Sequence, residues 1–398
     1  MSEVKVFEFA EEAPHIELNQ DGSTIDLSNW HEPANRNWSY RNAVDVLPHT
    51  RKISRGNGPV HALGDAPVDI SSVKVNYLNR DMSLEEYLRE SHSDSFLVLN
   101  GNDIVYENYR RMDPKDRHLC QSVTKTTVCA SIGELIVSGL IDPEKTVDTY
   151  IPDVASGFNG VAVQDLLDMN VALDFSEDFT DPNAEIYEYE MITGWHPDTG
   201  GQANGMLDYL SKLEQDPAFR LDGTTHYLCP NTDMLGLIIE KVSGRTFTDV
   251  FQEAIYQHIG AEADAYYCTD IRGAAICSGG MILRLRDLAR YAQTFANMGV
   301  ANDGTHVIPQ AWIDDCLDTA KGTRYYLGRG YQYHNQITSN GAALCHLGVG
   351  GQMIYANTVT KVVVVQFSTT SAPSNGDLDL GNALYNIADA INDFLQVQ

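Results

Sequence analysis

The sequence of 398 residues contains no run of about eighteen apolar residues, so a helix that spans a membrane is not expected. Its first residues also lack a basic segment followed by an apolar core, and a secretory signal is therefore not expected. Basic residues are scarce: 27 Lys and Arg stand against 55 Asp and Glu, which gives a net charge of -28. Such a surface repels nucleic acid and anionic membranes, so neither is expected as a partner.

Cysteine is too irregular in number and spacing for a disulfide framework. The seven cysteines are scattered and odd in number, which favours reduced thiols in a cytoplasmic protein. His226 and Cys229 resemble half of a metal site, but no second ligand pair follows at the spacing of zinc sites. We therefore expect neither a metal nor a cofactor. The sequence also lacks the Gly-x-Ser-x-Gly elbow of α/β-hydrolases and the phosphate-binding loop of the Walker type.

The sequence does contain Ser-x-x-Lys, at Ser2, Ser71 and Ser122. Only the third copy stands at the front of an apolar run, residues 128–139, that ends in glycine and predicts a helix. Residues three apart share a helix face, so the Lys125 amine can lie beside the Ser122 hydroxyl. A serine needs a neighbouring base to become a nucleophile, and burial favours the neutral, basic form of a lysine. The pair is therefore a candidate catalytic centre.

Strand signals lie near both ends of the chain. Residues 95–99 and 104–109 predict a hairpin, residues 354–356 and 362–367 predict buried strands, and residues 380–395 predict a terminal helix. Most of the first ninety residues are expected to be irregular. The pattern predicts an α+β fold with a sheet domain formed by residues 1–150 and 266–398. Residues 151–265 would form a mainly helical insertion whose acidic, aromatic loop, residues 177–195, covers the site.

Two further motifs can join the Ser122 pair. Tyr227 lies in His226-Tyr-Leu-Cys-Pro-Asn-Thr-Asp233, just before a predicted helix at residues 234–244. A phenol beside a lysine can share its proton, and the position of Tyr227 just before an Asn-containing turn and a helix favours this role over that of a core tyrosine. The segment His346-Leu-Gly-Val-Gly-Gly-Gln352 is rich in glycine and leads into a strand, where backbone amides can approach a substrate.

With these motifs, the chain resembles the superfamily of serine β-lactamases and penicillin-binding proteins. The likeness is to its class C β-lactamase-like hydrolases and type VIII esterases, and among these to the 6-aminohexanoate-dimer (nylon-oligomer) hydrolases. It extends over nearly the whole chain and includes residues 29–38, 94–99, 116–122, 167–169, 177–182, 194–195, 231–233 and 278–280. The resemblance implies a β-lactamase/transpeptidase-like fold, with a central antiparallel sheet flanked by helices.

The resemblance also implies the catalytic roles. Ser122 would be the acylated nucleophile, Lys125 its general base, and Tyr227 the group that passes the proton to the leaving amine or alcohol. The backbone amides of Ser122 and Val349 would form the oxyanion hole.

The third and second motifs depart from those of β-lactamases. His346-Leu347-Gly348 replaces Lys-Thr-Gly, whose cation helps to hold the carboxylate of the drug, so strong β-lactamase activity is not expected. In the second motif, Cys229 stands where those enzymes have asparagine, and Asn231 follows two residues later. We expect His346, Gly348 and Asn231 to contact the substrate.

Three residues of the covering loop are assigned to the substrate by the same resemblance. Phe179 stands where the nylon-oligomer hydrolases have a tyrosine that hydrogen-bonds the amide, which favours ester over amide hydrolysis. Glu190 would receive the ammonium end of the substrate, and Trp195 would be an aromatic residue of the lid.

Together these features predict a serine hydrolase that forms an acyl-enzyme. Its substrates would be small carboxylic esters, and linear amides such as 6-aminohexanoate oligomers are the next class. Two alternatives stay open: a D-amino-acid peptidase or weak β-lactamase, and a catalytically silent, ligand-binding relative. The sequence leaves open whether the chain forms a homodimer.

Overall fold

A nine-stranded sheet forms the centre of the computed structural model, which describes residues 24–201, 204–318, 320, 322–324, 330–338, 341–370 and 378–397. In spatial order its strands are β10 (Thr323–Arg324), β11 (Gly330–Gln332), β12 (Asn335–Thr338), β13 (Ala343–Gly348), β14 (Gln352–Asn357), β15 (Val362–Ser368), β5 (Ser93–Asn100), β6 (Asp103–Tyr109) and β2 (Gly64–Asp65). Neighbouring strands are antiparallel except β2 and β6. The predicted α+β class and antiparallel sheet are therefore confirmed.

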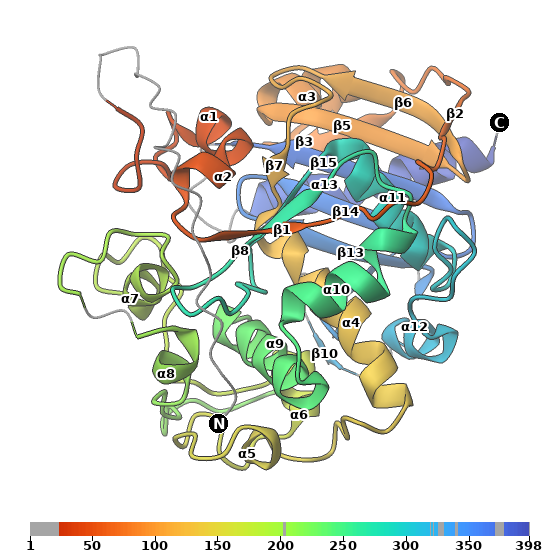
Figure 1. Ribbon diagram of the computed structural model, residues 1–398. Coiled ribbons are helices and arrows are strands. Elements are labelled where there is room, and N and C mark those ends of the chain that lie inside the picture. Colours follow the sequence, from red (N-terminus) through yellow and green to blue (C-terminus); the bar gives the residue numbers. More distant parts are fainter. Residues whose placement is uncertain are drawn as a thin grey trace.

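The central strands are buried on both faces because their side chains alternate between two cores. In β5, Leu97 and Leu99 join one cluster while Phe96 and Val98 join the other. The helix α11 (Leu285–Ala296) belongs to the first core, and the terminal helix α13 (Leu378–Gln396) belongs to the second. The sheet thus lies between two helical layers (Figure 1). The predicted hairpin, late strands and terminal helix are all present.

A smaller sheet connects the N-terminal segment to the Ser122 region. Its strands, in spatial order, are β1 (Thr50–Ile53), β8 (Ala265–Cys268), β9 (Met281–Leu283) and β7 (His118–Leu119). The N-terminal part also contains α1 (Arg36–Arg41), α2 (Ala43–Val46), β3 (Lys74–Tyr77), β4 (Arg80–Ser83) and α3 (Leu84–Glu90). Together with β1 and β2 they cover fewer than half of the described residues up to Glu90, so the expected mostly irregular start is confirmed, although its short elements were not predicted. These elements are short and their burial comes from packing on distant residues, which a local pattern does not reveal.

Helices predominate between residues 147 and 258. They are α5 (Val147–Tyr150), α6 (Val163–Leu167), α7 (Glu185–Ile192), α8 (Met206–Leu210), α9 (Cys229–Ser243), α10 (Phe247–Ala254) and the 3-10 turn η2 (Tyr256–His258). In Figure 1, α7 and α8 lie below α1 and α2, and α9 runs beside α4 (Lys125–Val137). The helix α12 (Gln310–Cys316) packs on α4 as well. The division at residues 151 and 265 stays a prediction.

None of the helices in the described residues is long and apolar enough to cross a membrane.

Candidate active site

Ser122 lies at the junction of a 3-10 turn and a helix. The turn η1 (Gln121–Thr124) follows β7 directly and runs into α4, which begins at Lys125. Gln121 has a φ of 49°, in the left-handed region that residues other than glycine seldom adopt. Ser122 and Lys125 are buried, with exposed fractions of 5% and 0%. The predicted placement of the pair on one helix face is confirmed, although its first turn is a 3-10 turn.

The Lys125 amine makes three contacts. Its Nζ lies 3.1 Å from Ser122 Oγ, 3.3 Å from Cys229 Sγ and 2.7 Å from the carbonyl oxygen of Ser278. A carbonyl oxygen only accepts hydrogen bonds, so an N–H of Lys125 must point at Ser278. The Ser122 hydroxyl accepts a hydrogen bond from Nζ, and it can donate to Nζ only when the amine is neutral. The amine is therefore held beside the hydroxyl from which a general base would take a proton.

Tyr227 and His346 form the second part of the site. The Tyr227 ring lies 4.9 Å below Lys125 Nζ, and its hydroxyl lies 3.3 Å from His346 Nε2. His346 Nδ1 contacts the backbone oxygen of His334, which can only accept, so Nδ1 carries the proton and Nε2 accepts from Tyr227. Burial, followed by the charge of Lys125, lowers the pKa of His346 to about 3, so the ring is neutral near pH 7.

The glycine-rich end of β13 packs directly against η1. A Cβ placed on Gly348 would lie only 2.9 Å from the Cys120 backbone oxygen and 3.1 Å from the Gln121 side chain. Glycine is therefore required for this approach. Among the described hydrogen bonds of turns and loops, none uses the amide of Ser122 or of Val349. The role of these two amides as an oxyanion hole stays a prediction.

Three carboxylic or thiol groups surround Lys125. Cys229 was expected from the sequence as a candidate thiol of the site, whereas Glu177 and Asp233 had no assigned role. Glu177 accepts a hydrogen bond from the Cys229 amide, and burial raises its pKa to about 7 although Lys125 pulls it down. Asp233 accepts from the Ser278 amide at 2.8 Å and from the Tyr189 hydroxyl at 2.7 Å. Burial raises the pKa of Asp233 to about 6 and keeps the Cys229 thiol protonated by raising its pKa as well. Asp233 therefore fixes the backbone that holds Lys125.

The predicted substrate residues occupy different surroundings. Trp195 is buried, and a Cβ on Gly279 would lie 2.9 Å from its ring, so the indole rests against the backbone beside Ser278. Phe179 is partly buried and its carbonyl accepts from the Tyr187 hydroxyl at 2.8 Å.

Asn231 and Glu190 are enclosed by protein. Asn231 is fully buried in the first turn of α9, with its amide 3.5 Å from Met169 Sδ. Glu190, on α7, is 6% exposed, and its Oε2 lies 2.9 Å from His196 Nε2. Contact of these residues with a substrate stays a prediction.

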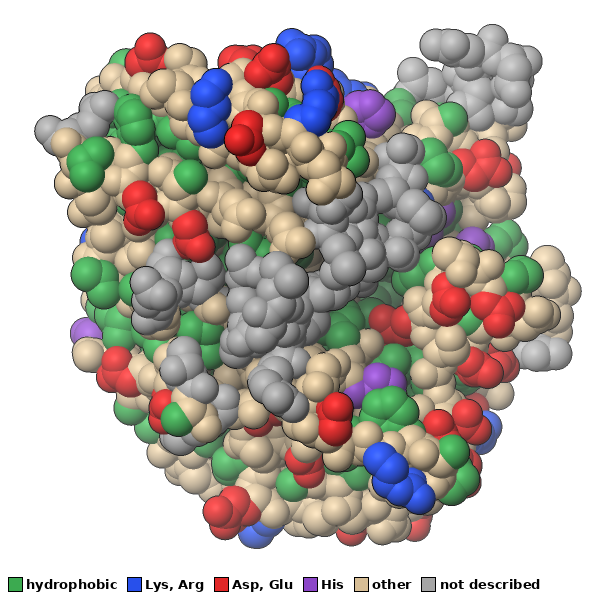
Figure 2. All heavy atoms as spheres, turned by 180° about the vertical axis from the view of Figure 1, so that it is seen from behind, with side chains coloured by type: hydrophobic (Ala, Val, Ile, Leu, Met, Phe, Trp, Pro, Cys, Tyr) green, Lys and Arg blue, Asp and Glu red, His purple; other side chains and the backbone are tan. Residues whose placement is uncertain are grey.

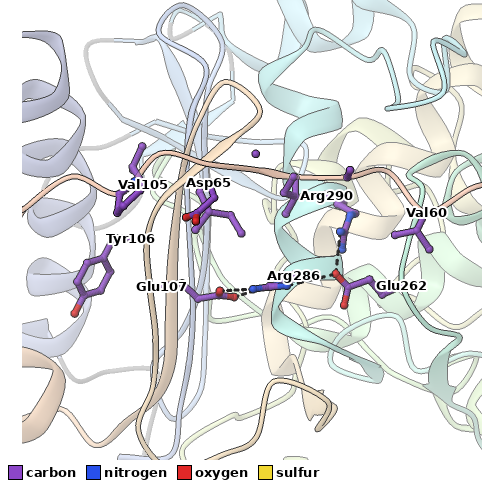
Figure 3. A pocket seen from close by; sticks show the side chains of 13 residues that line it. Val60, Asp65, Val105, Tyr106, Glu107, Glu262, Arg286 and Arg290 are labelled. Carbon is purple, nitrogen blue, oxygen red and sulfur yellow. Dashed lines mark hydrogen bonds and ion pairs between the residues drawn. The ribbon is translucent and has the colours of Figure 1, made fainter.

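A separate pocket of about 560 Å³ opens between β2, β6 and α11 (Figure 3). Its two cationic side chains are both paired: Arg286 with Glu107 at 2.6 Å, and Arg290 with Glu262 at 2.9 Å. No residue of the Ser122 site lines it. We therefore assign no catalytic role to this pocket.

The surface reflects the acidic composition. On the face shown in Figure 2, acidic side chains are scattered widely, and lysines and arginines appear in only a few places. The charge is thus a general property of the surface on this face and does not mark one binding site.

Comparison with known proteins places the chain in a family. The Beta-lactamase family model matches residues 83–386. The chain belongs to the beta-lactamase family. It is 29% identical to 6-aminohexanoate-dimer hydrolase of Paenarthrobacter ureafaciens over 360 residues, which cover 87% of this chain and 88% of the relative.

Solved structures agree with this beta-lactamase-family assignment at the level of the fold. A Bacillus anthracis protein named as a candidate 6-aminohexanoate-dimer hydrolase has a TM-score of 0.83 at 24% identity, covering 96% of this chain and 99% of the other. A family VIII carboxylesterase has a TM-score of 0.55 at 17% identity, covering 77% and 95%. The β-lactamase/transpeptidase-like fold and the family resemblance are confirmed, and the chain is a hydrolase of this superfamily.

Proposed function

We propose that this protein is a serine hydrolase that forms an acyl-enzyme on Ser122. The observation that carries the proposal is the buried contact of 3.1 Å between Lys125 Nζ and Ser122 Oγ. A hydroxyl with an amine fixed beside it, at the start of a helix, is the arrangement that nucleophilic catalysis requires. The family membership supports the same chemistry.

In the first half-reaction, Ser122 Oγ attacks the substrate carbonyl carbon while its proton moves to Lys125 Nζ. The tetrahedral oxyanion accepts hydrogen bonds from the Ser122 and Val349 amides, each of which contributes about 3 kcal/mol in comparable enzymes. The carbon bond to the leaving group then breaks. The proton from Lys125 reaches the leaving oxygen or nitrogen through the Tyr227 hydroxyl, which gives one proton and receives another.

In the second half-reaction, water attacks the acyl carbon and Ser122 leaves. The carboxylic acid is released, and the proton of the water restores the serine hydroxyl. Tyr227 returns to donating to His346, whose neutral ring accepts without competing for the catalytic proton.

Small esters are the substrate class that we propose, with linear amides next. Phe179 offers no side-chain donor to an amide leaving group, and an alkoxide or phenolate leaves with less protonation than an amine does. The 6-aminohexanoate-dimer hydrolase relative supports testing linear amides as well.

The test is active-site labelling with a fluorophosphonate, followed by peptide mapping, and turnover of p-nitrophenyl acetate and of 6-aminohexanoate dimer. Ser122→Ala should lose both the label and the turnover. Ser131→Ala is the matched control, because Ser131 is also a buried serine but lies further along, within α4, and outside the site. Label on another residue would overturn the assignment of the nucleophile. The absence of label and turnover in the unmodified protein would favour a silent relative, and rapid hydrolysis of a chromogenic cephalosporin would favour a β-lactamase.

A further inference from the structure

A cluster of two histidines and a carboxylate lies beside Trp195. His31 comes from the N-terminal segment, Glu190 from α7, and His196 from the loop that follows it. One ligand atom from each of these three residues lies within 4.8 Å of the other two. The cluster is separate from the Lys125 contacts described above, and residue spacing gives no sign of it because His31 is distant in sequence.

Two polar atoms of this cluster lack hydrogen bonds although they are buried. Neither His31 Nε2 nor Glu190 Oε2 has a hydrogen-bond partner among the described residues. Glu190 Oε2 lies 2.9 Å from His196 Nε2, but without hydrogen-bond geometry. A carboxylate that is only 6% exposed requires a nearby positive charge, and unsatisfied buried polar atoms are costly. A bound cation would satisfy both atoms together.

The chemistry of the three groups suits a divalent transition metal. Imidazole nitrogen and carboxylate oxygen are ordinary ligands of Zn²⁺, and two histidines with one glutamate form a known three-ligand set. Ligand atoms bonded at 2.0–2.1 Å in a tetrahedron lie about 3.3 Å apart, so small side-chain rotations close the cluster.

We propose that His31, Glu190 and His196 bind one Zn²⁺ ion or a similar divalent metal. The metal would connect the N-terminal segment to the loop that carries Trp195. Trp195 already receives a hydrogen bond at its carbonyl from Trp30 Nε1 at 2.8 Å. The His196 side chain is 28% exposed, which gives the ion a route from solvent and a water for its fourth position. No step of the Ser122 reaction requires this metal.

The same carboxylate cannot hold a metal and the ammonium end of a substrate at once. A zinc ion at this site would therefore weaken the binding of any substrate whose ammonium group depends on Glu190. Binding of zinc here would also contradict our expectation from the sequence that the protein binds no metal.

The test is isothermal titration of the full-length protein with Zn²⁺ after removal of metals with EDTA, under reducing conditions. One equivalent should bind, and Glu190→Gln and His196→Gln should each weaken binding more than about tenfold, since even outer ligands of a metal can contribute that much. His31→Gln should do the same. The matched control is His258→Gln, which removes another histidine that pairs with a carboxylate, Asp303, at 2.7 Å. It should leave binding unchanged.

A second readout reports the location. The centre of the Trp30 ring lies 3.6 Å from that of His31, with the two ring planes tilted by 39°, and the Trp195 ring lies 5.8 Å from the same histidine ring. Co²⁺ should therefore quench tryptophan fluorescence in the wild type and in Ser122→Ala, but much less in Glu190→Gln. Binding that is equal in wild type and all three ligand variants, or no binding at all, would overturn the proposal. Because Ser122→Ala should keep the metal, failure of the hydrolase proposal would be distinguishable from failure of this one.

Discussion

Glu177→Gln tests the electrostatics of the site most directly. Glutamine keeps an oxygen that can accept from the Cys229 amide, but it removes the ionisable group near Lys125. Burial raises the pKa of Glu177 to about 7 in the folded protein, from an ordinary 4.5. The folded protein therefore binds this proton more tightly than the unfolded chain. The free energy of unfolding of the wild type, relative to the variant, should fall as pH rises from about 4.5 to 7 and stay constant above.

The size of this effect follows from the linkage relation. Each pKa unit corresponds to about 1.4 kcal/mol, so the relative stability should change by roughly 2 to 3 kcal/mol between pH 5 and pH 8. The Glu177 side chain keeps some contact with solvent, which screens its charge, so the change in relative stability should not exceed this value. For a chain of this length it corresponds to a change of about 3 °C in the difference between the two melting temperatures. The stability of the variant relative to the wild type should therefore be higher at pH 8 than at pH 5.

The assay is differential scanning calorimetry of wild type and variant at pH 5, 6, 7 and 8. A buried carboxyl with a raised pKa elsewhere in the protein, such as Asp168, titrates in both proteins and cancels in the difference. Glu185→Gln is the control: Glu185 accepts a backbone hydrogen bond from Ser176 at 3.0 Å, but it is exposed. A difference between wild type and Glu177→Gln that does not vary with pH would refute the reasoning.

Three further substitutions test the proposed mechanism. Tyr227→Phe should lower kcat for p-nitrophenyl acetate about 100-fold or more with little change in KM, because it removes the proton path; an unchanged kcat would make Tyr227 structural. Gly348→Ala should also lower kcat, since its Cβ would meet the Cys120 oxygen and displace the Val349 amide, whereas Gly381→Ala, whose Cβ has an ordinary contact of 3.8 Å, should not. Phe179→Tyr should raise the ratio of amide to ester turnover, measured with 6-aminohexanoate dimer and p-nitrophenyl acetate, and an unchanged ratio would contradict the role given to position 179.

The parts of the site that could be predicted are those coded within short stretches. The spacing of Ser122 and Lys125 places them on one helix face whatever the rest of the chain does. The hairpin at residues 95–109 and the strand at 362–367 follow from runs of β-branched and apolar residues. Burial of the middle of β5 and of β15 on both faces agrees with these same residues, because successive apolar side chains enter the two cores in turn.

Contacts between distant segments could not be predicted in this way. Glu177 meets Cys229, and Asp233 meets Ser278, only because α9 packs beside α4 and the loop after β8. An acidic residue in an acidic chain gives no local sign that it will be buried. The same holds for His31, whose position beside Glu190 depends on the N-terminal segment packing on Trp195.

Buried charge is the feature that connects these missed residues. In a chain with a net charge of -28, placing Glu177, Asp233 and Glu190 inside the protein is costly unless each has a partner. Asp233 has two hydrogen-bond donors, and Glu177 has a backbone amide and the field of Lys125. Glu190 Oε2 has only the contact with His196, and no hydrogen bond among the described residues. The same physical requirement that explains the first two carboxylates therefore points to a cation beside the third.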